Sequence, residues 1–183
     1  METKPQKNPK IYIALNKPVD YSVSTDGEQN LLVSDLIIKE NYAGNYNKDL
    51  NAKDYFINAP DKDSEGLAIL TNDQGASAWF ARLYCEYELT IGRPLIRDAK
   101  KVLEAGMNID GEFFPGIKIK REFNKGKRTI ITINLKGKET RIRRMFGRLG
   151  YNISIIRRTK IGKLKLGTLP VGKWQLAKKE EVV

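Results

Sequence analysis

Short apolar segments separated by turn-forming residues constrain this 183-residue chain more than any other feature of its sequence. Residues 11–15 (Ile-Tyr-Ile-Ala-Leu) are stopped by Pro18, and residues 67–71 (Leu-Ala-Ile-Leu-Thr) follow the polar stretch 58–66. Such runs are too short to cross a membrane, which takes about 18 apolar residues or more, and they have the length of buried strands. They predict a globular domain that contains several strands and no transmembrane helix.

Two periodicities predict the other elements, because strands alternate every second residue and helices repeat every three to four. Strands are expected at residues 11–15, 55–57, 67–71, 84–91, 113–120, 128–135, 153–161, 164–166 and 171–176. A helical turn is expected within 31–37, and helices at 72–83, 97–105 and 140–149, the last closed by Gly150. Strands and helices mixed in this order predict an α+β fold.

The length is typical of one domain with one sizeable core. We expect residues 1–10 to form a disordered lead and residues 11–183 to form that domain. The first ten residues lack the apolar stretch of a secretory signal, so the cytoplasm is the expected compartment. No membrane partner and no obligate protein partner are indicated.

The net charge of +11 is distributed unevenly along the chain. Residues 1–117 hold 13 Lys and Arg against 18 Asp and Glu, which gives −5. Residues 118–183 hold 20 against 4, which gives +16. A surface that only keeps a protein in solution usually mixes its signs, so this asymmetry predicts a polyanion-binding face built mainly by the C-terminal third.

Histidine is absent and Cys85 is the only cysteine. An internal disulfide, a multi-cysteine zinc site and every catalytic triad that needs histidine are therefore excluded. Catalysis would have to come from carboxylate, tyrosine, lysine, arginine or hydroxyl groups.

The densest group of carboxylates lies in residues 58–66, Asn-Ala-Pro-Asp-Lys-Asp-Ser-Glu-Gly, between two expected strands. A calcium loop would need a bidentate carboxylate where Asn72 stands, and helices at its flanks. A magnesium phosphotransferase site would use Asp61 and Asp63, but no third metal carboxylate is evident. A structural turn, in which Asp63 caps local backbone and Gly66 takes a positive φ, is the simplest interpretation of this window alone.

Residues 61–73 (D-K-D-S-E-G-L-A-I-L-T-N-D) also resemble the D-x-D-T-x-G-L-L-L-L-T-N-D segment of the RsuA-type RNA pseudouridine synthases. Two further segments resemble the same family in the same order. They are L-N-K-P at 15–18 with S-V-S-T at 22–25, and K-E-T-R-I-R-R-M-F at 138–146, continued at 149–150, 163–167 and 172–174. Three collinear matches across residues 11–180 make the resemblance specific.

The resemblance implies a pseudouridine synthase catalytic fold: two packed halves around a bent, mainly antiparallel mixed sheet flanked by helices. It implies an isomerase that rearranges a uridine in RNA with no metal and no organic cofactor. Many relatives carry an N-terminal S4 RNA-binding module. With ten residues before the first expected strand, this chain looks most like the single-domain branch that modifies large-subunit ribosomal RNA. Structured RNA, ribosomal in that branch, is the implied partner.

Residue roles carry over from the matching positions of the family. The first aspartate of the acidic turn is the nucleophile, which implies that role for Asp61. The tyrosine of a following strand contacts the flipped uracil, which implies Tyr87. An arginine early in the basic helix pairs with the nucleophile, which implies Arg143, with Arg144 as the second candidate. Each role is chemically reasonable, since a buried carboxylate stays ionised beside a cation and an aromatic ring can hold an extruded base.

The remaining basic residues of the C-terminal third are expected to contact RNA phosphates. They are Lys138, Arg141, Arg148, Arg157, Arg158, Lys160, Lys163 and Lys165. The chain departs from the family at Ala59, where an arginine usually precedes the nucleophile, and at Cys85, where a lysine is common. These two departures motivate an alternative function, that of a catalytically weak or silent RNA-binding or ribosome-assembly protein on the same fold.

Overall fold

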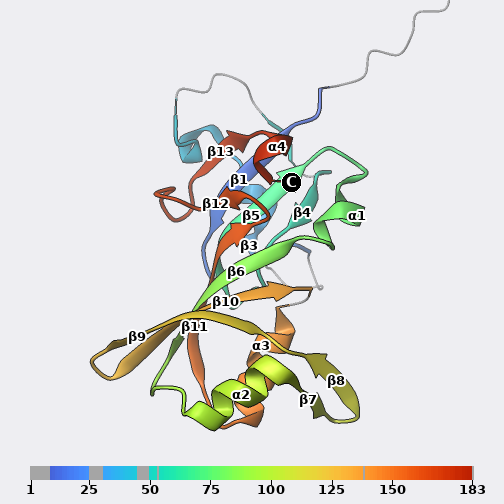
Figure 1. Ribbon diagram of the computed structural model, residues 1–183. Coiled ribbons are helices and arrows are strands. Elements are labelled where there is room, and N and C mark those ends of the chain that lie inside the picture. Colours follow the sequence, from blue (N-terminus) through green and yellow to red (C-terminus); the bar gives the residue numbers. More distant parts are fainter. Residues whose placement is uncertain (1–8, 25–30, 45–49, 53, 138, 183) are drawn as a thin grey trace, which may run out of the picture.

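The computed structural model describes residues 9–24, 31–44, 50–52, 54–137 and 139–182. Its centre is a nine-stranded mixed sheet (Figure 1). From edge to edge the strands are β13 (Trp174–Ala177), β1 (Tyr12–Lys17), β5 (Glu65–Thr71), β11 (Ile153–Ile161), β6 (Tyr84–Ile91), β10 (Arg128–Lys136) and β9 (Lys118–Lys125). In addition, β4 (Phe56–Asn58) pairs with β5, and β12 (Leu164–Lys165) pairs with β11. All pairs in this sheet are antiparallel except β5–β11.

Short elements surround the sheet. Two small sheets pair β2 (Tyr21–Ser22) with β3 (Leu31–Leu32), and β7 (Gly106–Ile109) with β8 (Glu112–Pro115). The helices are η1 (Val33–Leu36), η2 (Lys39–Asn41), α1 (Ala76–Phe80), α2 (Arg97–Ala105), α3 (Thr140–Arg148) and α4 (Lys179–Val182). The predicted α+β class with a mainly antiparallel sheet is therefore confirmed.

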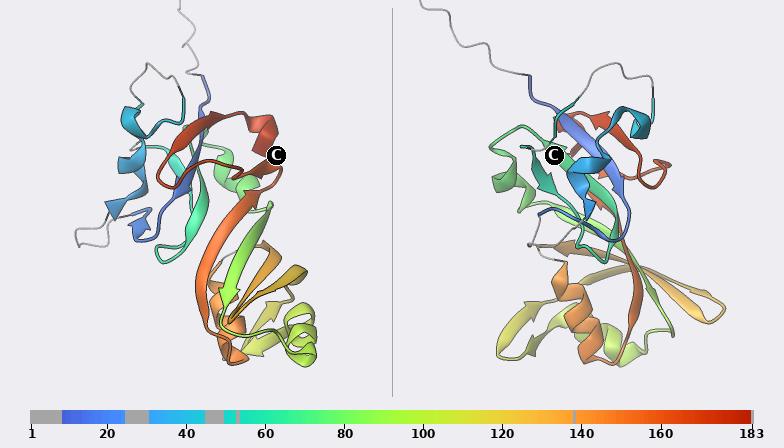
Figure 2. Two further views of the ribbon diagram at one scale, coloured as in Figure 1. Left: turned by 90° about the vertical axis from the view of Figure 1, so that its left-hand side faces the viewer. Right: turned by 180° about the vertical axis from the view of Figure 1, so that it is seen from behind.

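The molecule has two halves joined by the long strands β6 and β11 (Figure 2). In one half, β1 and β5 are buried on both faces, because alternate residues enter two separate cores. Leu15 and Leu70 face η1, whereas Ala14 and Ile69 face α1 and the C-terminal segment. This explains why both strands are almost continuously apolar. The other half packs α2 and α3 against β6 and β10 in a third core.

Several element boundaries differ from the sequence-based expectation. The first predicted helix shrinks to α1, because the carboxylate and carbonyl of Asp73 accept hydrogen bonds from the Gly75 and Ala76 amides and form a turn first. The strand expected at 113–120 is two strands, β8 and β9, in two different sheets. The turn Asp110-Gly111, with φ of 53° and 82°, closes an unexpected β7–β8 hairpin.

The start of the chain lies largely outside the described residues, as do 25–30 and 45–49. Pro9 and Lys10, which were expected to belong to a disordered lead, instead contact the fold. The Pro9 carbonyl accepts a hydrogen bond from Asn72 at 3.0 Å, and the Lys10 ammonium lies 3.0 Å from the Asp73 carboxylate. Within the described ranges, no helix is long and apolar enough to cross a membrane.

Candidate active site

A cavity of about 460 Å³ lies between the two halves of the molecule. The first half contributes the acidic turn after β4 and the end of α1. The second contributes β6 and the connection from β10 to α3. The polar side chains that line the cavity include Asn58, Asp61, Cys85, Tyr87, Glu139 and Arg158.

Asp61 is held by the turn that joins β4 to β5. Its carbonyl accepts a hydrogen bond from the Ser64 amide at 3.0 Å, which closes the turn. The Lys62 carbonyl accepts one from the Asp20 amide at 2.8 Å and a longer one, 3.4 Å, from the buried ammonium of Lys17. The turn is therefore fixed to the end of β1, and the half-buried Asp61 side chain faces the cavity while Asp63 is exposed.

Opposing influences act on the Asp61 carboxylate. Burial raises the pKa of Asp61 above its usual value, and the negative charge of Asp63 raises it further. The cations of Arg143, Arg158 and Lys17 lower the pKa of Asp61 and partly offset the cost of burial. Three cations around one carboxylate make this corner of the cavity suited to a reactive anion.

Arg143, which was expected to pair with Asp61, forms its salt bridge with Asp63. The guanidinium lies 2.8 Å from the Asp63 carboxylate and also donates to the Asp63 carbonyl at 3.2 Å. A further hydrogen bond, 3.3 Å long, reaches the Ile153 carbonyl. Arg143 thus secures the acidic turn to α3 and acts on Asp61 through its charge, without an ion pair to it.

Arg144, the second candidate for that pairing, is engaged elsewhere. Its guanidinium lies 3.4 Å from the Asp110 carboxylate and 3.1 Å from the Glu112 carboxylate, both on the β7–β8 hairpin. It also covers the Phe114 ring at 4.5 Å from the centroid. These contacts give Arg144 a role in fixing the hairpin and disfavour one at Asp61.

Arg158 was expected on the RNA-binding surface, and that expectation is wrong because the residue is only 4% exposed. Its Nε donates to the Leu67 carbonyl and its Nη2 to the Asn58 carbonyl, each at 2.7 Å. The guanidinium therefore joins β11 to both ends of the acidic turn and lines the cavity beside Asp61. It is the buried cation of the site that sequence reasoning missed.

Tyr87 was expected to contact the base, and its side chain does line the cavity. The residue is 1% exposed, and burial raises the pKa of its phenol, which therefore keeps its proton at neutral pH. Cys85 lies two residues earlier on the same face of β6, where burial raises the pKa of its thiol as well. Both groups are neutral, so the charged side chains that line the cavity are Arg158, Asp61 and Glu139.

Glu139 is a second carboxylate in the cavity, and sequence reasoning missed it. It precedes α3, is 6% exposed, and burial together with the charge of Asp61 raises the pKa of its carboxyl. The Ser64 hydroxyl and Arg158 act in the opposite direction. A signal was available, since Glu139 is the only acidic residue between Glu122 and Glu180, within an otherwise basic stretch.

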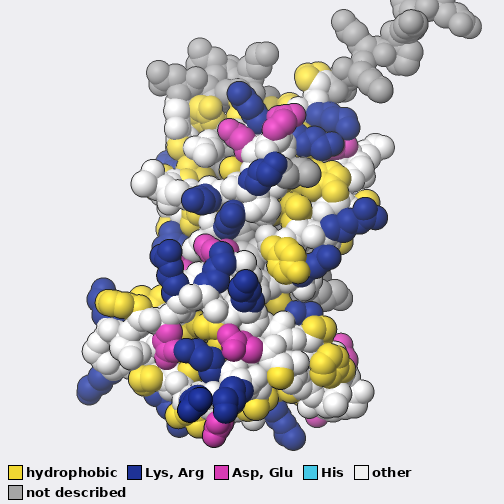
Figure 3. All heavy atoms as spheres, viewed as in Figure 1, with side chains coloured by type: hydrophobic (Ala, Val, Ile, Leu, Met, Phe, Trp, Pro, Cys, Tyr) yellow, Lys and Arg dark blue, Asp and Glu magenta, His cyan; other side chains and the backbone are white. Residues whose placement is uncertain are grey.

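The other expected phosphate-binding residues differ in exposure. Arg148, Lys163 and Lys165 are exposed, whereas Arg141 and Lys160 are half-buried. Arg157 lies 3.7 Å from the Glu65 carboxylate, with 37% of its side chain exposed. Lys138 falls outside the described residues. Figure 3 shows Lys and Arg side chains across one face of both halves, with a few acidic side chains among them.

The acidic turn lacks the side chains of a metal site within the described part of the chain. Among the residues that the structure describes, no three His, Cys, Asp or Glu side chains are grouped so that they could hold a metal ion. Asp61 and Asp63 therefore form no such group with a third carboxylate of the described residues, and Asp63 is already paired with Arg143. The calcium and magnesium interpretations gain no support from this geometry.

Comparison with known proteins identifies similar sequences. The chain is 31% identical over 179 residues to the dual-specificity RNA pseudouridine synthase RluF of Escherichia coli K12, across 94% of this chain and 56% of RluF. It is 29% identical over 183 residues to an uncharacterized RNA pseudouridine synthase of Aquifex aeolicus, across 94% of this chain and 67% of that protein. No family model matches.

A solved structure has the same fold. It is a crystal structure of a pseudouridylate synthase with a TM-score of 0.74 and 22% sequence identity, covering 95% of this chain and 73% of that one. At this identity the likeness concerns the fold alone. The chain spans a little over half the length of RluF, so its similarity is to one part of that enzyme.

Proposed function

We propose that the chain is an RNA pseudouridine synthase of the RsuA type, since it is similar in sequence to RNA pseudouridine synthases and has the fold of a pseudouridylate synthase, and that it isomerises uridine in RNA with Asp61 as nucleophile. One observation carries the proposal. Asp61 faces a cavity of about 460 Å³, and three cations act on its carboxylate. The cavity is large enough for an extruded nucleobase and has Tyr87 in its wall.

The reaction breaks the bond from C1′ of the ribose to N1 of uracil and forms a bond from C1′ to C5. The C5 proton leaves and N1 gains a proton, so the change is neither a redox step nor a hydrolysis. Asp61 supplies the nucleophilic carboxylate, which must be ionised to react. Arg143 and Arg158 favour the ionised form by lowering the pKa of Asp61 against the effect of burial, and Tyr87 offers a neutral ring and a hydroxyl to the base.

The uridine must leave its stacked position to reach the cavity, so the surrounding RNA has to be held through its phosphates. We assign that task to the basic residues of the C-terminal third that reach the surface. They are Arg141, Arg148, Arg157, Lys160, Lys163 and Lys165. Such contacts orient the RNA and make binding sensitive to salt, but carry little sequence information.

Ribosomal RNA is the first substrate to test, because the sequence motifs led to the expectation of a target in the large ribosomal subunit. The experiment maps pseudouridines in total RNA from cells with and without the gene. One or a few sites are expected to vanish with the gene and to return when it is restored. An unchanged map, with RNA binding intact, would instead favour the alternative function below.

Removing the negative charge of Asp63 is expected to extend activity to lower pH. Asp61 must be ionised, so activity is present above its pKa and is lost as the pH falls through it. Asp63→Asn removes one of the two causes that raise the pKa of Asp61, and it leaves the Arg143 cation without its present partner. The acidic limb of the profile of kcat/KM against pH should therefore shift to lower pH.

The matched control is Glu65→Gln, which removes a carboxylate two residues further along the same segment. Glu65 pairs with Arg157 and is not among the groups that shift the pKa of Asp61. The acidic limb should stay where it is in this variant. A shift of equal size in both variants would mean that total charge, and not the position of Asp63, sets the pKa of Asp61.

The alternative function, a catalytically weak or silent RNA-binding protein, rests on Ala59. This residue lines the cavity at the position where the family carries an arginine. The Arg158 guanidinium, bound to the Asn58 carbonyl, supplies a cation at the same place from another strand. Because Arg158 can replace the cation that the family carries at position 59, we favour the active enzyme.

A further inference from the structure

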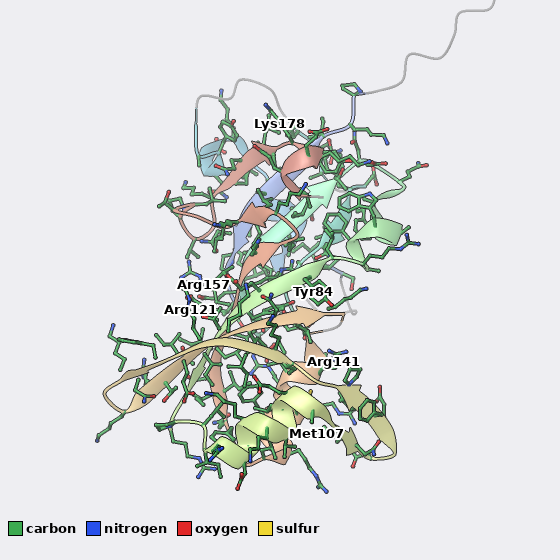
Figure 4. The ribbon with its side chains drawn as sticks, viewed as in Figure 1. Tyr84, Met107, Arg121, Arg141, Arg157 and Lys178 are labelled. Carbon is green, nitrogen blue, oxygen red and sulfur yellow. The ribbon has the colours of Figure 1, made fainter. Side chains whose placement is uncertain are left out.

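A second cavity, of about 650 Å³, lies beside the candidate active site. Strands β6, β9 and β10 contribute to it, together with the segment that follows β8 and the first turn of α3. Its lining includes one tyrosine and three cationic side chains, Tyr84, Lys118, Lys136 and Arg141. Figure 4 shows Tyr84 and Arg141 on the same side of the molecule. None of these four belongs to the lining of the first cavity.

The cations of this cavity have no anionic partner. Lys118, Lys136 and Arg141 form no salt bridge with any residue in the described part of the chain. By contrast, the nearby Lys120 of β9 lies 2.7 Å from the Glu86 carboxylate. The Nε of Arg141 is buried and lacks a hydrogen-bond acceptor among the described residues. A buried donor without a partner is costly, so the arrangement is suited to an anion from outside.

Tyr84 adds an aromatic surface to the three cations. The residue is 61% exposed, which is unusual for a ring on a central strand. The Lys136 ammonium lies 5.9 Å from the ring centroid. An exposed ring beside lysine and arginine is the combination with which proteins hold single-stranded nucleic acid, because the base stacks and the phosphate is neutralised.

The two cavities are neighbours along the same two strands. Tyr84 and Lys136 are directly opposed in the β6–β10 ladder. Their chain neighbours Cys85 and Gly137 line the candidate active site. A Cβ on Gly137 would lie 3.9 Å from the Arg141 guanidinium. A strand whose uridine enters the first cavity therefore passes within reach of the second.

We propose that the second cavity binds a nucleotide of the substrate RNA adjacent to the target uridine, with Tyr84 stacking on its base and Lys118, Lys136 and Arg141 binding its phosphates. This inference rests on the proposed function, since it takes the substrate to be RNA. It adds a nucleotide-binding subsite to that function. Part of the selection of the target would then occur at the neighbouring base.

The test measures binding of a fluorescein-labelled oligouridine by fluorescence anisotropy, in protein carrying Asp61→Asn so that no reaction follows. Tyr84→Ala is expected to weaken binding by about 5- to 100-fold, the effect of losing one stacked base, without changing the salt dependence. Tyr84→Phe, which keeps the ring, should bind like the parent. Lys136→Gln should instead reduce the slope of log affinity against log salt by about 0.7.

The control is Phe113→Ala, because Phe113 is exposed to a similar extent, 59%, but lines neither cavity. Binding should be unaltered in that variant. If Tyr84→Ala binds oligouridine as tightly as its parent, the subsite is overturned while the proposed function stands. If Tyr84→Ala weakens binding but pseudouridine mapping shows no loss with the gene, the subsite stands and the proposed activity fails.

Discussion

Asp61→Asn is expected to abolish pseudouridine formation, a loss of about 10⁴-fold or more, because removing a nucleophile removes the covalent route altogether. The amide keeps the shape of the carboxylate but cannot attack carbon. The free energy of unfolding should change by no more than about 1 kcal/mol. Burial and the charge of Asp63 destabilise the ionised Asp61 carboxylate, whereas the nearby cations stabilise it, so the two effects partly cancel. RNA binding should persist, because the variant removes a negative charge near the RNA.

Two measurements separate these effects. Pseudouridine mapping in cells without the gene, complemented by Asp61→Asn, reports activity, and anisotropy with labelled RNA reports binding. Asp98→Asn serves as the control, because the side chain of this α2 carboxylate is 85% exposed. It should complement fully. Restoration of the lost sites by Asp61→Asn would exclude Asp61 as the nucleophile.

Gly66→Ala is expected to destabilise the fold by about 3 kcal/mol or more. Gly66 has a φ of 105°, and a Cβ there would lie 2.3 Å from the Arg158 carbonyl oxygen. The two residues are directly paired in the short parallel contact between β5 and β11, so neither strand can move aside alone. A chain of this length loses about 2–4 °C in Tm per kcal/mol, so Tm should fall by about 6–12 °C.

Gly111→Ala provides the matched comparison. Gly111 also has a positive φ, 82°, but a Cβ there would meet nothing within 4 Å. The substitution should lower the free energy of unfolding only by the cost of holding an alanine at positive φ, about 1 kcal/mol. Thermal unfolding of both variants isolates the steric contribution at Gly66. Equal Tm values would mean that β5 and β11 adjust more easily than their pairing suggests.

The sequence predicted elements best where one periodicity ran without interruption. β6 and α2 have the expected bounds because their burial largely follows the expected alternation or helical spacing. β11 also has the expected bounds, although its burial alternates less regularly. The β7–β8 hairpin was missed, although Asp110-Gly111 is a turn signal, because residues 106–109 were assigned to no element between the helix expected at 97–105 and the strand expected at 113–120. The alternation then continued across Gly116, so two strands of different sheets were predicted as one.

For the site, the sequence motifs brought Asp61 and Tyr87 together in one cavity. Arg158 was missed because the charge pattern assigned it, together with Arg157 and Lys160, to the phosphate-binding surface. Glu139 was missed because it was considered only as part of the basic segment 138–146. Charge along the chain cannot tell which of two adjacent arginines, Arg157 or Arg158, faces inward. A bulge in the β11–β6 pairing next to Arg158 helps to decide that, and no local sequence signal predicts it.

The hydrogen bonds of Arg158 have a consequence for how this turn can diverge in evolution. Its guanidinium binds the backbone carbonyls of Asn58 and Leu67, and every amino acid supplies a carbonyl. Side chains at positions 58 and 59 are therefore released from holding the nucleophile's turn, and can drift while the backbone around Asp61 stays fixed. The sequence Asn-Ala-Pro ahead of Asp61 is an instance of that freedom, and lineages that retain the β11 arginine should vary most at these two positions.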